Sequence, residues 1–512
     1  MKVSRLVLIT FVLLGIVGLT AFWGGSPAIP VDGSIDEIIP ESGTAETLSA
    51  TWYCAAGGLG ESAPSTHEVL LANPSKEVVP VRLTAYNAQG PVGESKTIAS
   101  VAEQVTPVDV NAVFGGSELS VMAEFDSGAL AVQHRITTAT SADSVPCSTT
   151  SSERWFFPAQ TSVLGSSALL VLFNPFSADA GVDITAAVQD GLRAPKEWAG
   201  IVVPAGTSRV IDLGEYVQRR DQFSVAVRLR NGSLIAESAQ SFDIAANGDV
   251  PAERGLRLQL GVPEARSGWT FAAGFKGPGV KEELVVYNPG RQVASVIIQV
   301  TPYGGASDPP EPFELSVPAR RFLILDLSAE QRIPDTGFHS LRVETSAKTP
   351  VVAARTTQLF GPPTAAAEPA AGSTPTGSTA AGSAAGTRPN ETLGVAIGTA
   401  TPVYARRWIL PAVRTGPEQQ PMVFIHNPTA GIVTVDLRAL AGQAAPIEIA
   451  TSLEVAAGDS LFVPLAVQEL TGVGDWVVTL RASDSVAVEQ LQTFATQNDL
   501  SFGSAVPVLV NR

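Results

Sequence analysis

The sequence predicts an all-β fold, in which tandem immunoglobulin-like antiparallel β-sandwich repeats follow one N-terminal transmembrane helix. Three observations lead to this prediction. Residues 6–23 form a single uncharged apolar run. A pattern of strand-like segments then recurs four times along the 512 residues. Within each repeat, apolar and polar residues alternate in short runs rich in Val, Ile and Thr, which is typical of half-buried antiparallel strands.

The N-terminal segment predicts a membrane anchor. Lys2 and Arg5 precede the apolar run at 6–23, which is just long enough to cross a bilayer core of about 30 Å as a helix. No Lys or Arg occurs between residues 24 and 75, so the positive-inside rule places the N-terminus in the cytoplasm and the remainder outside. We therefore expect a single-pass protein of the cell membrane that contacts the cytoplasmic membrane through residues 6–23. The alternative is a cleaved signal peptide and a secreted protein.

The repeat is marked by Asn-Pro dipeptides that end strand-like runs, each preceded by a Trp 19 to 21 residues earlier. The dipeptides are Asn73-Pro74, Asn174-Pro175, Asn288-Pro289 and Asn427-Pro428, and the preceding residues are Trp52, Trp155, Trp269 and Trp408. Pro fixes φ for a turn and Asn can bond the turn backbone, so the dipeptides are interpreted as structural turn markers. The Trp residues are interpreted as core anchors, the alternative being an exposed one that stacks on sugar.

Each repeat holds about seven short alternating runs, the number expected of an immunoglobulin-like sandwich. A β-propeller blade needs only about 40–50 residues and fits less well. The expected domains are a signal anchor at 1–23, an acidic stalk at 24–50, and β-sandwiches at 51–150, 151–249, 250–360 and 393–512. In three repeats an Asp ends a later strand, at Asp109, Asp212 and Asp326. We expect a structural role for these carboxylates, with calcium binding between sandwiches as the alternative.

Residues 361–392 contain no aromatic residue and no Val, Ile or Leu. Such an Ala/Gly/Ser/Thr/Pro-rich segment cannot bury apolar area and predicts a flexible linker. On this interpretation it separates the first three sandwiches from the fourth, which is tethered. The alternative is an insertion in a loop of one sandwich.

The only two cysteines, Cys54 and Cys147, fall near the first and last strands of the first repeat. Outside the cytoplasm an even pair of this kind predicts a disulfide.

The composition offers little for catalysis. The net charge is −16, which argues against nucleic-acid binding, because phosphate neutralisation needs a basic face. With two Cys and four His, a metal or iron–sulfur centre is not expected, and no cofactor is predicted. The sequence contains no nucleophile-elbow, P-loop or zinc-protease motif. We therefore expect a protein without enzymatic activity.

The start Trp52-Tyr53-Cys54-Ala55-Ala56-Gly57, the run from His67 to Pro74 and the later strand–Asn-Pro units resemble a known family. It is a family of uncharacterised actinobacterial membrane-anchored envelope proteins, defined by a domain of unknown function with a W-Y-C-A-x-G start. The resemblance implies an envelope location and an N-terminal membrane segment. The family carries no known activity, so the resemblance implies no catalytic residue.

These observations lead to one functional expectation and one alternative. We expect a non-catalytic, extracytoplasmic, membrane-anchored scaffold or binding protein of the bacterial cell envelope, with an envelope protein or glycan as its partner. The alternative is a carbohydrate-binding accessory protein of envelope glycan assembly, which predicts two or more exposed Trp or Tyr side chains in a groove. An enzyme would need a deep pocket with convergent carboxylates.

Overall fold

The computed structural model describes residues 49–508, except 61–63, 127–129, 246–251, 306–307, 361–391, 400–402, 417–418, 420, 443, 466–469, 471–473 and 495–498. The expected membrane anchor and almost all of the expected stalk lie outside these residues. Within the described part of the chain, no helix is both long enough and apolar enough to cross a membrane.

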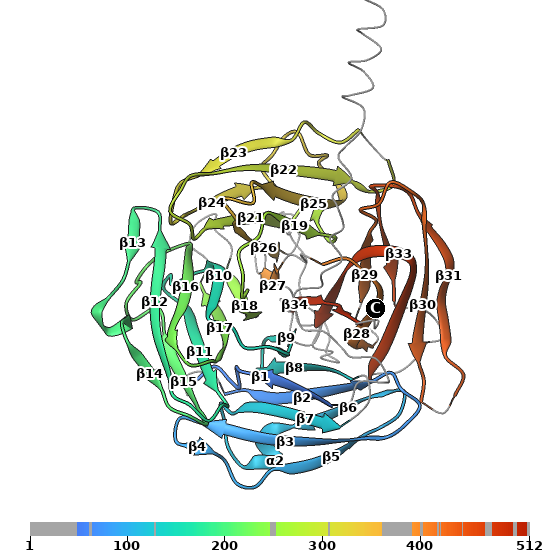
Figure 1. The fold of residues 1–512 in the computed structure, drawn as a ribbon. Helices are drawn as coiled ribbons and strands as arrows, with labels where there is room; N and C mark the ends of the chain where they lie inside the picture. Colours follow the sequence, from blue (N-terminus) through green and yellow to red (C-terminus); the bar gives the residue numbers. More distant parts are fainter. Residues whose placement is uncertain are drawn as a thin grey trace, which may run out of the picture.

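The described chain is nearly all β-strand and forms four units in sequence, each built from antiparallel strands arranged in an outer and an inner sheet (Figure 1). The outer sheet of the first unit contains β1 (Ser49–Cys54), β7 (Ser120–Asp126), β3 (Val79–Asn87), β4 (Gly90–Pro91) and β5 (Lys96–Ser100). Its inner sheet has the order β6 (Gln104–Asp109), β2 (Thr66–Asn73), β8 (Ala131–Thr137) and β9 (Ala142–Pro146). The short helix α2 (Val110–Phe114) follows β6.

The second unit repeats this order, and the third repeats it except that one short strand pairs with the second strand of the outer sheet instead of the third. The outer sheet of the second contains β10 (Arg154–Gln160), β16 (Phe223–Asn231), β12 (Ala180–Val188), β13 (Gly191–Arg193) and β14 (Ile201–Val203); its inner sheet contains β15 (Thr207–Asp212), β11 (Ser166–Asn174), β17 (Ile235–Ile244) and β18 (Glu253–Leu260). In the third they are β19 (Gly268–Phe271), β25 (Gly337–Thr345), β22 (Ala294–Pro302), β23 (Phe313–Val317) and β20 (Phe275–Lys276), then β24 (Arg321–Asp326), β21 (Val280–Asn288), β26 (Val352–Phe360) and β27 (Thr392–Thr399). Single 3-10 turns cover Lys196–Trp198 and Tyr303–Gly305.

The fourth unit differs in one respect, because the long strand β33 (Gly474–Phe494) runs through both of its sheets. One part of β33 pairs with β28 (Ala405–Thr415) and β30 (Val433–Leu440), and β31 (Ile447–Val455) and β35 (Val506–Pro507) complete that sheet. The other part pairs with β29 (Met422–His426) and β34 (Asp499–Ser504), and β32 (Ser460–Pro464) pairs with β29.

The four units close into a ring. The last strand of each inner sheet, β9, β18, β27 and β34, lies at the centre, and each contacts the next in cyclic order (Figure 1). The fourth unit packs against the first, and Ile409, Leu440 and Val477 join the apolar core of the first unit. Central inner strands are therefore buried on both faces, one against their own sandwich and one against neighbouring units.

Two strands lie on the far side of the boundaries expected from sequence. Strand β18 falls in the range expected for the third sandwich but pairs with β17 of the second. Strand β27 pairs with β26 of the third unit. The repeat pattern was anchored on Trp and Asn-Pro, which mark the beginning of a unit, whereas the central strand carries no such marker.

The expected role of residues 361–392 as a linker between the third and fourth sandwiches is wrong. The segment joins β26 to β27, which are adjacent antiparallel strands of one inner sheet, with Leu359 opposite Gly394. It is therefore an insertion within the third unit, the alternative left open by the sequence. The composition predicted only that the segment has no core of its own, and composition does not reveal which elements a segment connects.

The four Asn residues make the same contacts in every unit. Each is fully buried, its Nδ2 donates to the backbone oxygen four residues later and to a second backbone oxygen 27 to 29 residues later, and its Oδ1 accepts the amide two residues later. The four Trp side chains are also buried in the cores. Trp155 and Trp269 donate to the carbonyls of Leu234 and Val351, which occupy equivalent positions before the third inner strand.

The expected strand-end role of the three Asp residues agrees with their contacts. Asp109 caps α2 by accepting the amide of Ala112. Asp212 accepts the amide of Gly214, and Asp326 accepts those of Ser328 and Ala329. No group of three or more potential metal ligands occurs among the residues that the structure describes.

We expect Asn288→Ala to lower the free energy of unfolding by about 2–4 kcal/mol, because it leaves the buried carbonyl of Val317 and the carbonyl of Gln292 without their donor. Asn87→Ala is the control, since Asn87 makes one exposed turn hydrogen bond. Denaturant titrations of both variants and the wild type provide the measurement. Equal losses in the two variants would contradict the structural role of the buried Asn.

We also expect the two fragments to remain associated after the chain is cleaved at a protease site introduced within residues 361–391. Strands β26 and β27 lie on opposite sides of the cut but are paired along their length, and β27 also contacts β18 and β34. A denaturing gel shows that cutting is complete, and size-exclusion chromatography shows whether the two pieces elute together. A separately eluting C-terminal piece would restore the linker interpretation.

Candidate functional site

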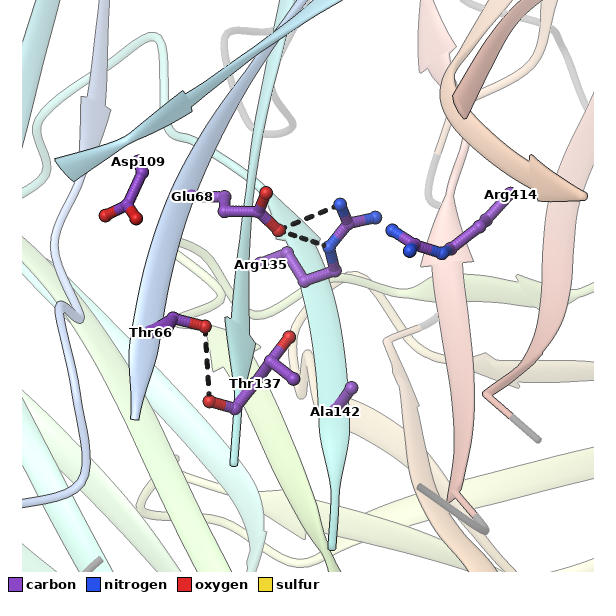
Figure 2. Close-up of a pocket in the computed structure, with 7 residues that line it drawn as sticks. All are labelled: Thr66, Glu68, Asp109, Arg135, Thr137, Ala142 and Arg414. Atoms are coloured by element: carbon purple, nitrogen blue, oxygen red, sulfur yellow. Dashed lines mark hydrogen bonds and ion pairs between the residues drawn. The ribbon is translucent and has the colours of Figure 1, made fainter. Parts of the chain in front are cut away.

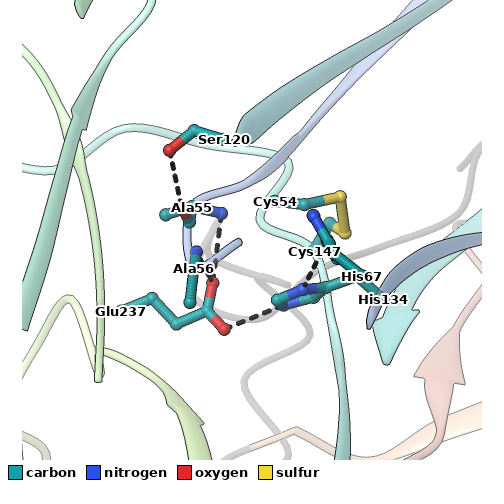
Figure 3. Close-up of a disulfide and its surroundings, with 8 residues drawn as sticks. All are labelled: Cys54, Ala55, Ala56, His67, Ser120, His134, Cys147 and Glu237. Atoms are coloured by element: carbon teal, nitrogen blue, oxygen red, sulfur yellow. Dashed lines mark hydrogen bonds and ion pairs between the residues drawn. A yellow bond between two sulfur atoms is a disulfide. The ribbon is translucent and has the colours of Figure 1, made fainter. Parts of the chain in front are cut away.

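The disulfide expected from sequence is present at the edge of the first unit. Cys54 ends β1 in the outer sheet, Cys147 follows β9 in the inner sheet, and the two buried sulfurs are joined across a sequence separation of 93 residues (Figure 3). The bond therefore ties the first outer strand to the last, central strand of the same unit. Closing so long a loop contributes at most about 4–5 kcal/mol in the chain-entropy model.

Beside the disulfide, a buried chain of polar side chains joins the first unit to the second (Figure 3). Nε2 of His67 lies 3.2 Å from Nδ1 of His134, and Nε2 of His134 lies 2.8 Å from Oε1 of Glu237. The other oxygen of Glu237 accepts the amides of Ala55 and Ala56 at 3.1 and 3.0 Å. Because Glu237 belongs to β17 and the other residues to the first unit, the carboxylate fixes the seam between the two units.

Burial governs the charge of this seam. It lowers the pKa of His67 well below its ordinary value, and the neighbouring His134 adds to the effect. At the ring centre, Asp143 of β9 accepts the amide of Leu258 in β18 at 2.6 Å. Burial raises the pKa of Asp143 to about 7 against the opposing effect of that hydrogen bond. These side chains are enclosed by protein, so their contacts are interfaces between units.

The seam between the third and fourth units uses the same kind of contact. Glu489 of β33 accepts the amide of Ala273 at 2.6 Å, and Arg355 of β26 lies 3.5 Å away. Burial raises the pKa of Glu489 to about 7, although the charge of Arg355 opposes the shift. Glu237 and Glu489 occupy equivalent positions in their inner strands, and Ala55 and Ala273 both follow the first outer strand of a unit. A carboxylate that accepts an amide from the preceding unit therefore recurs at two seams.

A polar pocket opens at the fourth seam, where the last unit meets the first. Its volume is about 250 Å³, and its walls come from the first unit's inner sheet and from β28 of the fourth unit (Figure 2). The lining residues are Thr66, Glu68, Asp109, Arg135, Thr137, Ala142 and Arg414. Four of the seven are charged, and none is aromatic.

Arg135, which lines this pocket, is held in position by two carboxylates. Its Nε donates to Glu68 at 3.0 Å, and its two terminal nitrogens donate to the two oxygens of Asp475 at 2.9 and 3.0 Å. Burial works against the charge of Arg135, but the carboxylates of Asp475 and Glu68 outweigh it and raise the pKa of the guanidinium. The bidentate contact crosses from β8 to β33, so it also fastens the ring at its point of closure.

Arg414 is held far less firmly than Arg135. Its nearest carboxylate is the same Asp475, at 3.5 Å, and about a third of its side chain is exposed. Figure 2 shows Asp109 at one end of the pocket and Arg414 at the other, with the Glu68–Arg135 ion pair between them. The pocket therefore presents opposite charges at its two ends and hydroxyl groups from Thr66 and Thr137 along one wall.

The residues singled out by sequence are not part of this pocket, except Asp109. The Trp and Asn-Pro markers lie in the cores and turns of their own units, and Cys54 and Cys147 form the disulfide. Sequence reasoning missed Glu68, Arg135, Glu237, Asp475 and Arg414. One signal was available, because Gln133, His134 and Arg135 interrupt a strand with three successive polar residues.

The fold and the contacts define a class of protein in which repeated β-sheet units close into a ring. A model for a family of unknown function, DUF5719, matches residues 116–388. The match spans more than half of the 512 residues. The chain therefore belongs to this family.

Other comparisons add little. No curated protein matches the sequence. A solved structure, described as the crystal structure of Thermotoga maritima 1070, is similar at 23% sequence identity over 19% of this chain and 84% of that one. Its TM-score is 0.17, so the likeness carries no argument about fold or function.

We expect the contribution of His67 to stability to depend on pH. Its pKa is lower in the folded protein than the ordinary 6.5, so the unfolded chain binds more protons in acid. The stabilising contribution is therefore present above about pH 6.5 and is lost as the pH falls. Denaturation midpoints of wild type and His67→Gln, measured from about pH 8 to pH 4, should converge toward acid. A difference that is constant with pH would contradict this assignment.

Proposed function

We propose that the protein is a non-catalytic, membrane-anchored scaffold or binding protein on the outer side of the cytoplasmic membrane of a bacterial envelope. The observation that carries the proposal is the closed ring, in which buried carboxylates join neighbouring β-sheet units and a disulfide ties the two sheets of the first unit together. We further propose that each unit is an immunoglobulin-like sandwich and that residues 6–23 form the anchor. We also propose an actinobacterial source, which the family resemblance supports.

The location rests on two independent features. Disulfides persist in oxidising compartments and are rare in the cytosol, and the Cys54–Cys147 bond is buried in the first unit. Positive charges precede the apolar run at 6–23, and acidic residues follow it. Both features favour a location of the ring on the side of the membrane that faces away from the cytoplasm.

A binding role is favoured because the described histidines, which are typical catalytic groups, contact other buried side chains of the protein. His67 contacts His134, His134 pairs with Glu237, and His339 lies 3.0 Å from the buried Glu282. His426 contacts the hydroxyl of Ser460 at 2.8 Å. These contacts lie in the protein interior, where they stabilise the fold.

The carbohydrate-binding alternative depends on exposed aromatic side chains. Among the residues that the structure describes, every Trp and Tyr is buried or half-buried. The pocket at the closing seam has no aromatic lining residue. The described surface therefore presents no exposed Trp or Tyr for stacking on sugar, and we favour the scaffold or binding role.

Thiol trapping in cells that produce the full chain tests the location. We expect Cys54 and Cys147 to react with a maleimide reagent only after reduction, and the chain to sediment with membranes. Protease added to spheroplasts should degrade the ring, whereas a cytoplasmic marker protein should survive. The samples are acid-quenched and denatured before labelling, and Cys54→Ser serves as the control, because its remaining thiol, which is buried in the folded protein, then reacts without reduction. Reduced cysteines together with protection from protease would overturn the proposed location.

Co-sedimentation of the detergent-solubilised full chain with purified envelope fractions addresses the partner. Retention by a protein-containing fraction that survives glycan digestion supports the scaffold role. Retention that is abolished by glycan digestion would instead favour the carbohydrate-binding alternative.

A further inference from the structure

The pocket between the first and fourth units exists only because the ring closes. Its residues come from β2, β6, β8 and β9 of the first unit, whereas Arg414 comes from β28 of the fourth (Figure 2). Two charged side chains of the pocket, Glu68 and Arg414, are partly exposed, each with about 30% of its surface accessible to solvent. A small solute can therefore reach groups that the fold itself holds in position.

The acidic end of the pocket carries more negative charge than its hydrogen bonds neutralise. Glu68 and Asp109 lie directly opposite each other on β2 and β6. Like charges at such positions destabilise a sheet. Glu68 is paired with Arg135, and one oxygen of Asp109 caps α2. This end is therefore suited to receive a cation that lies between two carboxylates.

The basic end has the opposite imbalance. Asp475 is shared between two guanidinium groups and is bound closely by Arg135, which leaves Arg414 with a 3.5 Å contact. An arginine in this setting gains from a bidentate carboxylate that completes its hydrogen bonding. The basic end is therefore suited to an anion, and a carboxylate has the geometry that a guanidinium prefers.

A ligand with a single charge satisfies only one end of the pocket. A carboxylate alone faces Glu68 and Asp109, and an amine alone faces Arg414. A volume of about 250 Å³ also lies below the range of about 300–1,000 Å³ usual for pockets that enclose drug-sized ligands. We propose that this pocket binds a small zwitterion of the α-amino acid class, with its ammonium group toward Asp109 and Glu68 and its carboxylate toward Arg414. The proposal deepens the proposed binding function by naming a ligand class.

Calorimetric titration of the purified full chain tests the proposal with matched probes. Alanine and glutamine, each in both enantiomers, carry both charges, whereas propionate lacks the ammonium group and ethylamine lacks the carboxylate. We expect the amino acids to bind and to raise the thermal midpoint by mass action. Propionate and ethylamine should bind at least tenfold more weakly.

Two variants test the assignment of the two ends. Arg414→Gln removes the basic end, and Asp109→Asn removes the acidic charge while keeping a side chain that can cap α2. Each should weaken amino acid binding at least tenfold and leave the unliganded thermal midpoint close to that of the wild type. Arg438→Gln is the matched control, because Arg438 lies in the same unit as Arg414 and makes an exposed ion pair with Glu448.

Three results would overturn the proposal: no heat of binding from any probe at millimolar concentration, equal binding of the singly charged probes, or equal weakening by Arg438→Gln. None of these results bears on the thiol and protease readouts, which test the location separately. Conversely, a ring found in the cytoplasm would leave the titration result standing. The two proposals therefore fail in distinguishable ways.

Discussion

The rest of the structure depends on closure of the ring, and closure depends on carboxylates buried between units. A sandwich that stands alone needs only one covered face on each sheet. Here the inner strands are covered on both faces, and β8 is buried along six of its seven residues. Polar groups at such positions must find partners, since an unpaired buried group costs about 1–3 kcal/mol. Glu237, Asp143 and Glu489 meet this requirement by accepting amides from a different unit.

This solution has an electrostatic consequence. The raised pKa values of Asp143 and Glu489 mean that their favourable contribution is present in acid and is lost as the pH rises toward about 7. His67 and His426 have lowered pKa values, so their contribution is present above about pH 6.5 and is lost as the pH falls. The two sets act over the same range of pH with opposite sign.

Sequence reasoning predicted features that every repeat needs and missed features that belong to one seam. Asn73 and its three counterparts make equivalent hydrogen bonds, so the repetition itself pointed to their role. Arg135 has Ala239, Thr356 and Leu491 as its equivalents in the other units. Its purpose depends on Asp475, which lies 340 residues away in sequence. A pattern that compares repeats with one another contains no information about which unit packs against which.

The candidate binding site lies at the closing seam because that seam differs from the others. In a ring of similar units, each seam between consecutive units is flanked by a direct chain connection, whereas the first and fourth units meet without one. Non-covalent contacts hold that seam, among them the bidentate Arg135–Asp475 contact and a hydrogen bond from the Gly442 amide to the carbonyl of Glu103. Once Asp475 is engaged by Arg135, Arg414 beside it lacks an equally close partner. The charge that remains available to a ligand is therefore a consequence of how the ring is fastened, and any change that loosens the fastening alters the pocket as well.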